Sequence, residues 1–139
     1  FNLSHSGRYV ASVFSESETG IDLEQIRKGQ SRIAERFFAP EEYLALQKEK
    51  MEDTDRRFTE LWTRKESYIK AVGKGMALDL ASFCVLREQV EVLKSEQKEQ
   101  WYLQSFCPKS GYILSVCAKE RIQCKIQWIG ETMFSQKFI

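Results

Sequence analysis

The chain has 139 residues, with 21 basic and 20 acidic side chains and a formal net charge of +1. This length fits one domain, and 42% hydrophobic with 29% charged residues excludes a disordered or collagen-like chain. The near-neutral charge argues against general nucleic-acid binding, and no apolar run approaches the roughly 18 residues that a membrane span requires.

The first part of the chain predicts strands and then short helices. Residues 8–14 alternate and are rich in β-formers, 15–20 form a polar turn, and 19–23 begin a second strand, so we expect a hairpin. A short helix follows over 31–38. Pro40 opens another helix, because proline fits the first helical position and acidic residues follow it.

The longest periodic segment predicts a helix over 53–72, capped by Asp53 or Thr54 and ended by Gly73 and Gly75. Its apolar residues at helical spacing are Phe58, Leu61, Trp62, Ile69 and Val72. The period then changes to two, which predicts strands over 82–86, 90–93, 100–106, 112–118 and 125–129. This order indicates an α+β fold, an antiparallel sheet packed against a long helix.

The four cysteines form no CxxC pair, which argues against a zinc ribbon or a thioredoxin-type site. They lie in apolar, strand-like stretches, and we expect buried free thiols. Free thiols favour a reducing compartment, so we expect the protein in the cytoplasm. The cysteines are Cys84, Cys107, Cys117 and Cys124.

Two carboxylates stand two residues apart in the predicted strand that contains Gly20-Ile21-Asp22-Leu23-Glu24. Residues two apart share one face of a strand, so Asp22 and Glu24 project to the same side about 7 Å apart, with Ile21 and Leu23 toward the core. Like charges at this spacing repel unless a cation lies between them. Taken alone, the pattern better fits a solvated strand face with two unlinked acids.

A second cluster lies on the long predicted helix, in Trp62-Thr63-Arg64-Lys65-Glu66-Ser67-Tyr68-Ile69-Lys70. Glu66 and Lys70 are one turn apart, and Trp62 one turn earlier shields that face from water. On an isolated helix this would be an ordinary surface ion pair. Combined with Asp22 and Glu24, however, Glu66 completes a carboxylate set suited to Mg²⁺, while lysines suit phosphate oxygens.

The only histidine lies in Asn2-Leu3-Ser4-His5-Ser6-Gly7, where two serines flank it just before a strand. Such a polar loop suits contact with an anion, although a lone histidine is more often structural or simply exposed.

These segments together resemble the surfactin-type (Sfp-type) 4′-phosphopantetheinyl transferases. The resemblance rests on Phe1–Gly7, on 20–24 and on 58–75, three motifs in the family's order, and 36–43 and 111–116 also match, so it covers nearly the whole chain. It implies one half of a pseudo-two-fold fold, with the transferase domain over 1–130 and a C-terminal tail over 131–139. It also implies transfer of the phosphopantetheine arm of coenzyme A to a serine of an apo acyl or peptidyl carrier protein, with release of adenosine 3′,5′-bisphosphate.

The resemblance assigns metal and catalytic roles. Asp22, Glu24 and Glu66 would surround Mg²⁺ together with the pyrophosphate of coenzyme A. Glu66, or a water that it orients, would accept the serine proton. Lys70 would stabilise charge as the phosphorus–oxygen bond breaks.

The resemblance also assigns binding roles. Lys65 and Lys70 would hold phosphates, and Ser4 and His5 would contact the 3′-phosphate of coenzyme A. We expect the carrier protein to dock near 30–50, beside the basic cluster of Arg27, Lys28, Arg32 and Arg36. No nucleic acid or membrane partner is expected.

Full-length relatives of this type have two similar halves with coenzyme A in the cleft between them, and this chain corresponds to the second half plus a junction strand. We therefore expect a missing N-terminal half or a second copy to complete the cleft. Two alternatives stay open: a magnesium-dependent nucleotide-diphosphate phosphohydrolase, and a non-catalytic carrier-binding module. The sequence does not name the carrier, the preferred metal or the oligomeric state.

Overall fold

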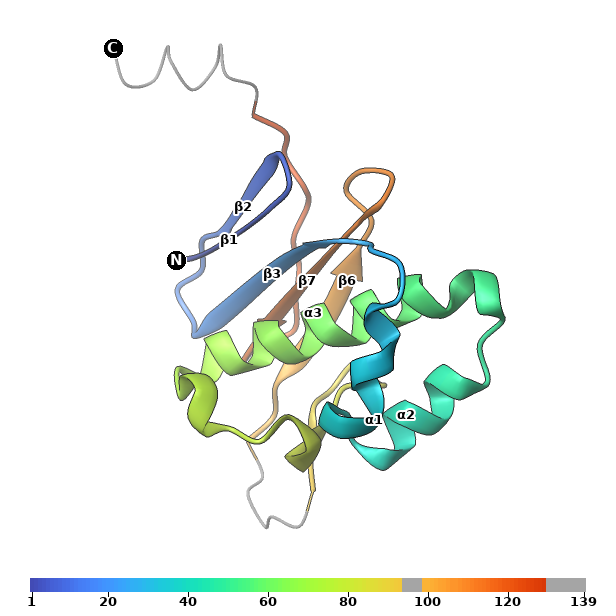
Figure 1. Ribbon diagram of the computed structural model, residues 1–139. Helices are drawn as coiled ribbons and strands as arrows, with labels where there is room; N and C mark the ends of the chain where they lie inside the picture. Colours follow the sequence, from blue (N-terminus) through green and yellow to red (C-terminus); the bar gives the residue numbers. More distant parts are fainter. Residues whose placement is uncertain (94–98, 130–139) are drawn as a thin grey trace.

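A three-stranded antiparallel sheet lies at the centre of the computed structural model, which describes residues 1–93 and 99–129. Its strands are, in spatial order, β3 (Thr19–Gln25), β7 (Tyr112–Ala118) and β6 (Tyr102–Phe106). The long helix α3 (Thr54–Val72) crosses one face of this sheet (Figure 1). The predicted α+β fold is confirmed.

Helix α3 forms where the 3.6-residue period predicts it. Phe58, Leu61 and Tyr68 on its apolar stripe are buried against the sheet and the short helices. The helix ends at Gly73, which adopts a left-handed conformation (φ 75°) and donates its N–H to the Ile69 carbonyl over 3.0 Å. Asp53 stands at the N-cap position, but its side chain makes no capping hydrogen bond.

The short helices α1 (Ala34–Phe37) and α2 (Pro40–Gln47) lie in the predicted places, and α2 packs beside α3. A 3₁₀ turn over Gln30–Ile33 leads into α1, and others cover Met51–Asp53, Gly75–Ala77 and Leu80–Ser82. Helices α1 and α2 form the lower right of the molecule in Figure 1.

The sheet separates two apolar cores. The main core lies between α3, the short helices and the inner sheet face, with Phe58, Leu61 and Trp101 among its members. The smaller core lies on the other sheet face and contains Ile21 and Leu23. The prediction that these two residues of β3 face a core, away from Asp22, is confirmed.

The predicted hairpin is wrong in its pairing. Strand β2 (Tyr9–Val13) pairs with β1 (Asn2–Ser6), while β3 pairs with β7. The hairpin turns at Gly7 instead, where φ is +56° and a Cβ would lie 2.2 Å from the Tyr112 hydroxyl oxygen. The β1–β2 hairpin lies beside β3 in Figure 1.

The later strands are partly as predicted. Strands β6 and β7 form, whereas β4 (Phe83–Cys84) and β5 (Glu91–Val92) are much shorter than expected. The strand predicted over 125–129 is wrong, because this stretch has no regular structure and its large apolar side chains are exposed. The proposed tail over 131–139 lies outside the described residues.

All four cysteines are free, but only half of the burial prediction is confirmed. Cys84 and Cys117 are buried, whereas Cys107 and Cys124 are exposed. Within the described residues, the helices are too short or too polar to span a bilayer.

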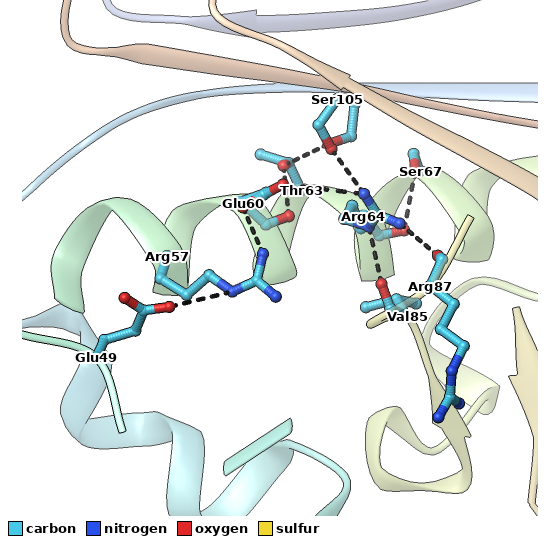
Figure 2. A network of polar contacts seen from close by, with 10 residues as sticks. Glu49, Arg57, Glu60, Thr63, Arg64, Ser67, Val85, Arg87 and Ser105 are labelled. Atoms are coloured by element: carbon cyan, nitrogen blue, oxygen red, sulfur yellow. Dashed lines mark hydrogen bonds and ion pairs between the residues drawn. The ribbon is translucent and has the colours of Figure 1, made fainter. Parts of the chain in front are cut away.

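A polar network fixes α3 to the segment after β4 and to β6. The buried Arg64 donates to the carbonyls of Val85 (2.8 Å) and Arg87, and to the Ser105 hydroxyl (3.4 Å). Figure 2 shows this arginine between helix and strands, with Glu60 and Arg57 continuing the network along the helix toward Glu49. The network lies apart from the carboxylates of β3 and serves the fold.

Candidate active site

Helix α3 lies unusually close to β3, and glycine allows it. A Cβ on Gly20 would lie 2.1 Å from the Ser67 carbonyl oxygen and 2.6 Å from the Ala71 nitrogen, both backbone atoms of α3. Because side chains alternate along a strand, Asp22 and Glu24 project from the same face as Gly20, toward the helix. The close approach therefore brings two acids of β3 to Glu66 and Lys70 of α3.

Asp22 is the most buried acid of this group. Its Oδ1 accepts hydrogen bonds from Lys70 Nζ (3.1 Å) and Ser4 Oγ (3.2 Å). Its Oδ2 is buried and has no hydrogen-bond partner among the described residues. Burial raises the pKa of Asp22 to about 6, against the opposing attraction of Lys70. A buried oxygen without a partner is costly, so this atom is suited to a ligand that supplies positive charge.

Glu24 and Glu66 complete a set of three mutually repelling acids, which we call the carboxylate cluster (Asp22, Glu24, Glu66). Burial raises the pKa of both residues, and repulsion from Glu66 adds to the effect on Glu24. Repulsion from Asp22 likewise raises the pKa of Glu66, while Lys70 lowers it. The pKa of each acid is thus raised mainly by burial and further by a neighbouring acid, so a bound cation would stabilise the charged forms.

Lys70 of α3 makes polar contacts with strand β3. Its Nζ donates to the Ile21 carbonyl (2.9 Å) and pairs with Asp22, and the side chain stays about one third exposed. The ion pair between Lys70 and Asp22 agrees with the predicted nearness of these two residues. The i,i+4 partner Glu66, however, is not its closest acid.

The prediction that Lys65 holds phosphate is wrong. Its ammonium is fully buried and pairs with Glu42 of α2 at 2.8 Å, and both side chains are 0% exposed. It also donates to the carbonyls of Leu80 (2.6 Å) and Phe83 (2.7 Å), which uses all three of its donors. Lys65 points into the main core, away from the carboxylate cluster, because it stands four residues after Leu61 and seven after Phe58 on the buried stripe.

Ser4 and His5 lie on opposite faces of β1. Ser4 is buried, and its hydroxyl is occupied by Asp22 and by the Leu23 N–H. His5 is exposed on the outer face of the hairpin. Their side chains therefore cannot meet at one phosphate, and the shared role predicted for them needs correction.

Sequence reasoning missed two residues beside the site and one in the core. Asn2 and Ser6 bind β3 from the hairpin, and Glu42 holds Lys65. The alternation of Asn2, Ser4 and Ser6 along β1 was a signal, because residues two apart share a face. Glu42 carried no local signal, since its partner lies on another helix.

The chemistry of the cluster fits a divalent cation, although the side chains are not gathered around one. Within residues 1–93 and 99–129, no three His, Cys, Asp or Glu side chains lie close enough together to hold a metal ion. The unpartnered Asp22 Oδ2 and the raised pKa values of all three acids nevertheless fit an oxygen-liganded ion such as Mg²⁺.

Comparison with known proteins places the chain in a family. The sequence profile of the 4′-phosphopantetheinyl transferase superfamily matches residues 8–117. The chain is 41% identical over 122 residues to the 4′-phosphopantetheinyl transferase Sfp of Bacillus subtilis (strain 168), covering 85% of this chain and 54% of that protein. It is 38% identical over 120 residues to the 4′-phosphopantetheinyl transferase gsp of Aneurinibacillus migulanus, covering 85% of this chain and 51% of that protein.

Solved structures share the fold. The holo-acyl-carrier-protein synthase of Thermotoga maritima superposes with a TM-score of 0.56 at 15% identity, covering 73% of this chain and 61% of that one. The apo-ACPS of Chronobacterium ammoiniagenes gives a TM-score of 0.54 at 20% identity, covering 71% and 92%.

The chain spans about half the length of the curated relatives that it matches. Because the superfamily profile covers most of the sequence and these relatives are 38% and 41% identical to it, the chain belongs to the 4′-phosphopantetheinyl transferase superfamily.

Proposed function

We propose that the protein transfers the 4′-phosphopantetheine arm of coenzyme A to a serine of an apo acyl or peptidyl carrier protein. The carrier serine oxygen bonds to phosphorus, the bond from phosphorus to adenosine 3′,5′-bisphosphate breaks, and the serine proton passes to the enzyme. The carboxylate cluster beside Lys70, in a chain of this superfamily, is the observation that carries the proposal.

The carboxylate cluster would hold Mg²⁺. The ion, when bound, would neutralise charge on the pyrophosphate of coenzyme A. Asp22 offers the free Oδ2, and Glu24 and Glu66 are only partly buried, so their carboxylates are accessible to a ligand.

Glu66 is the proposed base, acting directly or through a water that it orients. Burial and repulsion from Asp22 raise the pKa of Glu66, which makes its carboxylate a stronger base. Lys70 compensates negative charge on the phosphate as the leaving group departs, since its partly exposed ammonium adjoins the cluster. Phosphoryl-type transfer needs mainly such positioning and charge compensation.

His5 remains a candidate contact for the 3′-phosphate of coenzyme A, because its imidazole is exposed on the hairpin. Lys65 has no part in this proposal. Either a second half of a longer protein or a second copy would complete the coenzyme A cleft next to the hairpin.

The carrier protein is proposed to dock on the basic cluster, whose four residues are exposed: Arg27, Lys28, Arg32 and Arg36. Charges of opposite sign mainly raise the association rate and are screened by salt. Reversal of Arg32 and Arg36 to Glu should raise the KM for the carrier and flatten its salt dependence, with little change in the KM for coenzyme A. A change in the coenzyme A constant alone would place these arginines at the nucleotide instead.

One experiment tests the proposed reaction. The protein is incubated with coenzyme A, Mg²⁺ and an apo carrier, and the carrier is weighed by mass spectrometry. We expect a mass gain of one phosphopantetheine, dependent on Mg²⁺. Cleavage of coenzyme A without that gain would indicate a phosphohydrolase, and no reaction with retained carrier binding would indicate a non-catalytic module. The cytoplasmic location expected from free thiols stays a prediction.

A further inference from the structure

Strand β1 binds the outer edge of β3 through side chains instead of through its backbone. Three alternate residues of β1 each accept a hydrogen bond from a backbone N–H of β3, over 2.9, 3.0 and 3.0 Å. The pairs are Asn2 Oδ1 with Ile21, Ser4 Oγ with Leu23, and Ser6 Oγ with Gln25. We call these three residues the side-chain ladder (Asn2, Ser4, Ser6).

The ladder satisfies an edge that would otherwise be open. In the sheet, β3 pairs on one side only, with β7, so its other N–H groups need acceptors. Side chains two residues apart on β1 match N–H groups two residues apart on β3, because both strands have a period of two. The match fixes the register of the hairpin against the strand that carries Asp22 and Glu24.

Two members of the ladder also contact the carboxylate cluster. Ser4 Oγ donates to Asp22 Oδ1 over 3.2 Å, and Ser6 Oγ donates to Glu24 Oε2 over 3.4 Å. A hydroxyl has one proton to donate. Each serine therefore accepts from the backbone and gives its only proton to a neighbouring acid, which sets both the rotamer of the serine and the orientation of the carboxylate.

The two carboxylate oxygens of Asp22 therefore have different surroundings. Ser4 and Lys70 both bind Oδ1, whereas Oδ2 is the buried atom without a partner in the described structure. The serine thus turns the carboxylate so that one oxygen stays available. Asn2 at the other end of the ladder binds only backbone, so the contact with acids is particular to the two serines.

We propose that Ser4 and Ser6 are positioning residues that orient Asp22 and Glu24 for a ligand, and that the Ser4 hydroxyl does not contact the 3′-phosphate of coenzyme A. The part of this inference that concerns coenzyme A rests on the proposed function. The part that concerns the orientation of the acids does not.

The orientation is tested with Ser4→Ala and Ser6→Ala in the whole chain, with Mn²⁺ as a spectroscopic probe of the cluster. We expect each variant to bind Mn²⁺ about 10–100-fold more weakly, as is typical when a residue supporting a metal ligand is removed. Amide hydrogen exchange should accelerate at Leu23 in Ser4→Ala and at Gln25 in Ser6→Ala, by roughly tenfold for one lost hydrogen bond. Ser4→Thr and Ser6→Thr, which keep the hydroxyl, should restore both measurements.

Ser12→Ala is the matched control, because Ser12 lies exposed on the outer face of the same hairpin. It should change neither measurement. Unchanged Mn²⁺ affinity in Ser4→Ala and Ser6→Ala, with both folded, would overturn the inference, as would a wild-type chain that binds no Mn²⁺. If Ser4→Ala fails to fold, the partly buried contact between Ser6 and Glu24 decides the matter.

A comparison of coenzyme A with 3′-dephospho-coenzyme A separates positioning from direct phosphate contact. In Ser4→Ala we expect a lower kcat but an unchanged ratio of KM values for the two substrates. His5→Ala should bring that ratio closer to one. If the ratio of the two KM values instead approached one in Ser4→Ala, the Ser4 hydroxyl would contact the 3′-phosphate after all. A chain that binds Mn²⁺ with the expected serine dependence, yet transfers nothing, would refute the proposed function and leave the orientation intact.

Discussion

At the scale of single residues, Asp22 is a carboxylate whose surroundings disfavour its charged form. Its carboxylate is buried, meets two other acids, and keeps one oxygen without a partner in the described chain. In this environment the charged form is disfavoured and only partly compensated by Lys70. The proposed ligand-binding role of Asp22 therefore comes at the expense of the stability of the ligand-free protein.

Asp22 should make the metal-free protein less stable as pH rises. Its pKa is about 6 in the folded chain and about 4 when unfolded, so the folded state binds more protons between these values. The stabilisation is complete below pH 4 and is lost as pH rises through 6, by up to about 3 kcal/mol. Relative to the unaltered chain, Asp22→Asn should remove this component of the pH dependence and abolish transfer.

Denaturant unfolding at several pH values in the presence of a chelator measures this effect, with exposed Glu52→Gln as the control. A pH profile of Asp22→Asn that parallels that of the unaltered chain would show that Asp22 titrates normally. Full turnover by a folded Asp22→Asn variant would remove Asp22 from the proposed site.

Lys65 and its neighbour Glu66 show how adjacent residues on one helix take unrelated roles. Burial lowers the pKa of Lys65, and the nearby Glu42 opposes this effect. Glu42 is itself held by the N–H groups of Ala39 (2.9 Å) and Val85 (2.8 Å). The pair therefore joins α2 and α3 to the chain before, within and after β4.

Lys65→Met should destabilise the fold by about 3–5 kcal/mol, because it leaves the Glu42 carboxylate buried without its counter-charge. Adding Glu42→Gln should recover part of this loss, since the buried charge is then gone. Lys119→Met breaks the exposed pair with Glu18 and should cost less than about 1 kcal/mol. Denaturant unfolding of the four proteins measures the coupling, and equal costs at Lys65 and Lys119 would contradict the core role of Lys65.

At the scale of elements, the contact between β3 and α3 determines the geometry of the site. Glycine is the only residue type that this contact accommodates at position 20, because a Cβ on Gly20 would overlap the helix backbone. Even a small separation of strand and helix would move Asp22 and Glu24 away from Glu66 and Lys70. The glycine of the Gly-Ile-Asp-Leu-Glu segment is therefore part of the site without touching a ligand.

Gly20→Ala should destabilise the protein by roughly 1–3 kcal/mol through overpacking and should also weaken Mn²⁺ binding. Gly73→Ala is the control, because no atom lies within 4 Å of its added Cβ and only the left-handed backbone (φ +75°) is strained. It should cost roughly 1–2 kcal/mol without affecting the metal. Thermal unfolding and Mn²⁺ titration separate the two effects, and undiminished Mn²⁺ affinity in Gly20→Ala would show that the contact is not needed.

Local patterns were sufficient for some elements and not for others. Helix α3 was predictable almost to the residue, because its period, its breaker Gly73 and its polar start are all local. The partner of β2 was not predictable, because strand pairing depends on residues distant in the sequence. Strand β3, the expected partner, pairs with β7 instead. Residues 125–129 alternate like a strand, but alternation without a pairing edge gives no strand.

The candidate site divides in the same way. The shared face of Asp22 and Glu24 follows from strand alternation, and the nearness of Lys70 follows from the motifs read together. The role of Lys65 was misassigned because its charge was weighted above its place on the apolar stripe. The ladder of Asn2, Ser4 and Ser6 depends on the observed register between the hairpin and β3, which the sequence does not contain.

At the scale of the whole molecule, one face of the β1–β2 hairpin packs on the smaller core and the other is exposed. Its inner face packs Tyr9, Ala11 and Val13 on the smaller core. Its outer face exposes large apolar side chains, with Val10 at 69% and Phe14 at 78%, beside Leu3 and His5. Several large exposed apolar side chains on one face are a feature of interfaces.

We predict that the chain associates through this outer face, either with a second copy or with another polypeptide. Combined Val10→Lys and Leu3→Lys substitutions should shift the chain toward a monomer in sedimentation velocity, because burying the new charges would cost several kcal/mol. Leu44→Lys, at an exposed apolar position on α2, should leave association unchanged.

We also predict that a lone chain binds coenzyme A weakly, because a partner on this face would complete the proposed coenzyme A cleft. If the partner supplies two or three charge-assisted hydrogen bonds to phosphate, each is worth about 1.5–3 kcal/mol. Their loss weakens affinity by roughly two to six orders of magnitude, at 1.4 kcal/mol per tenfold. Calorimetric titration of the lysine variant with coenzyme A tests this, since its monomer should bind far more weakly than the associated chain. A stable monomer that binds coenzyme A in the low micromolar range would instead show that one copy of this chain carries a complete site.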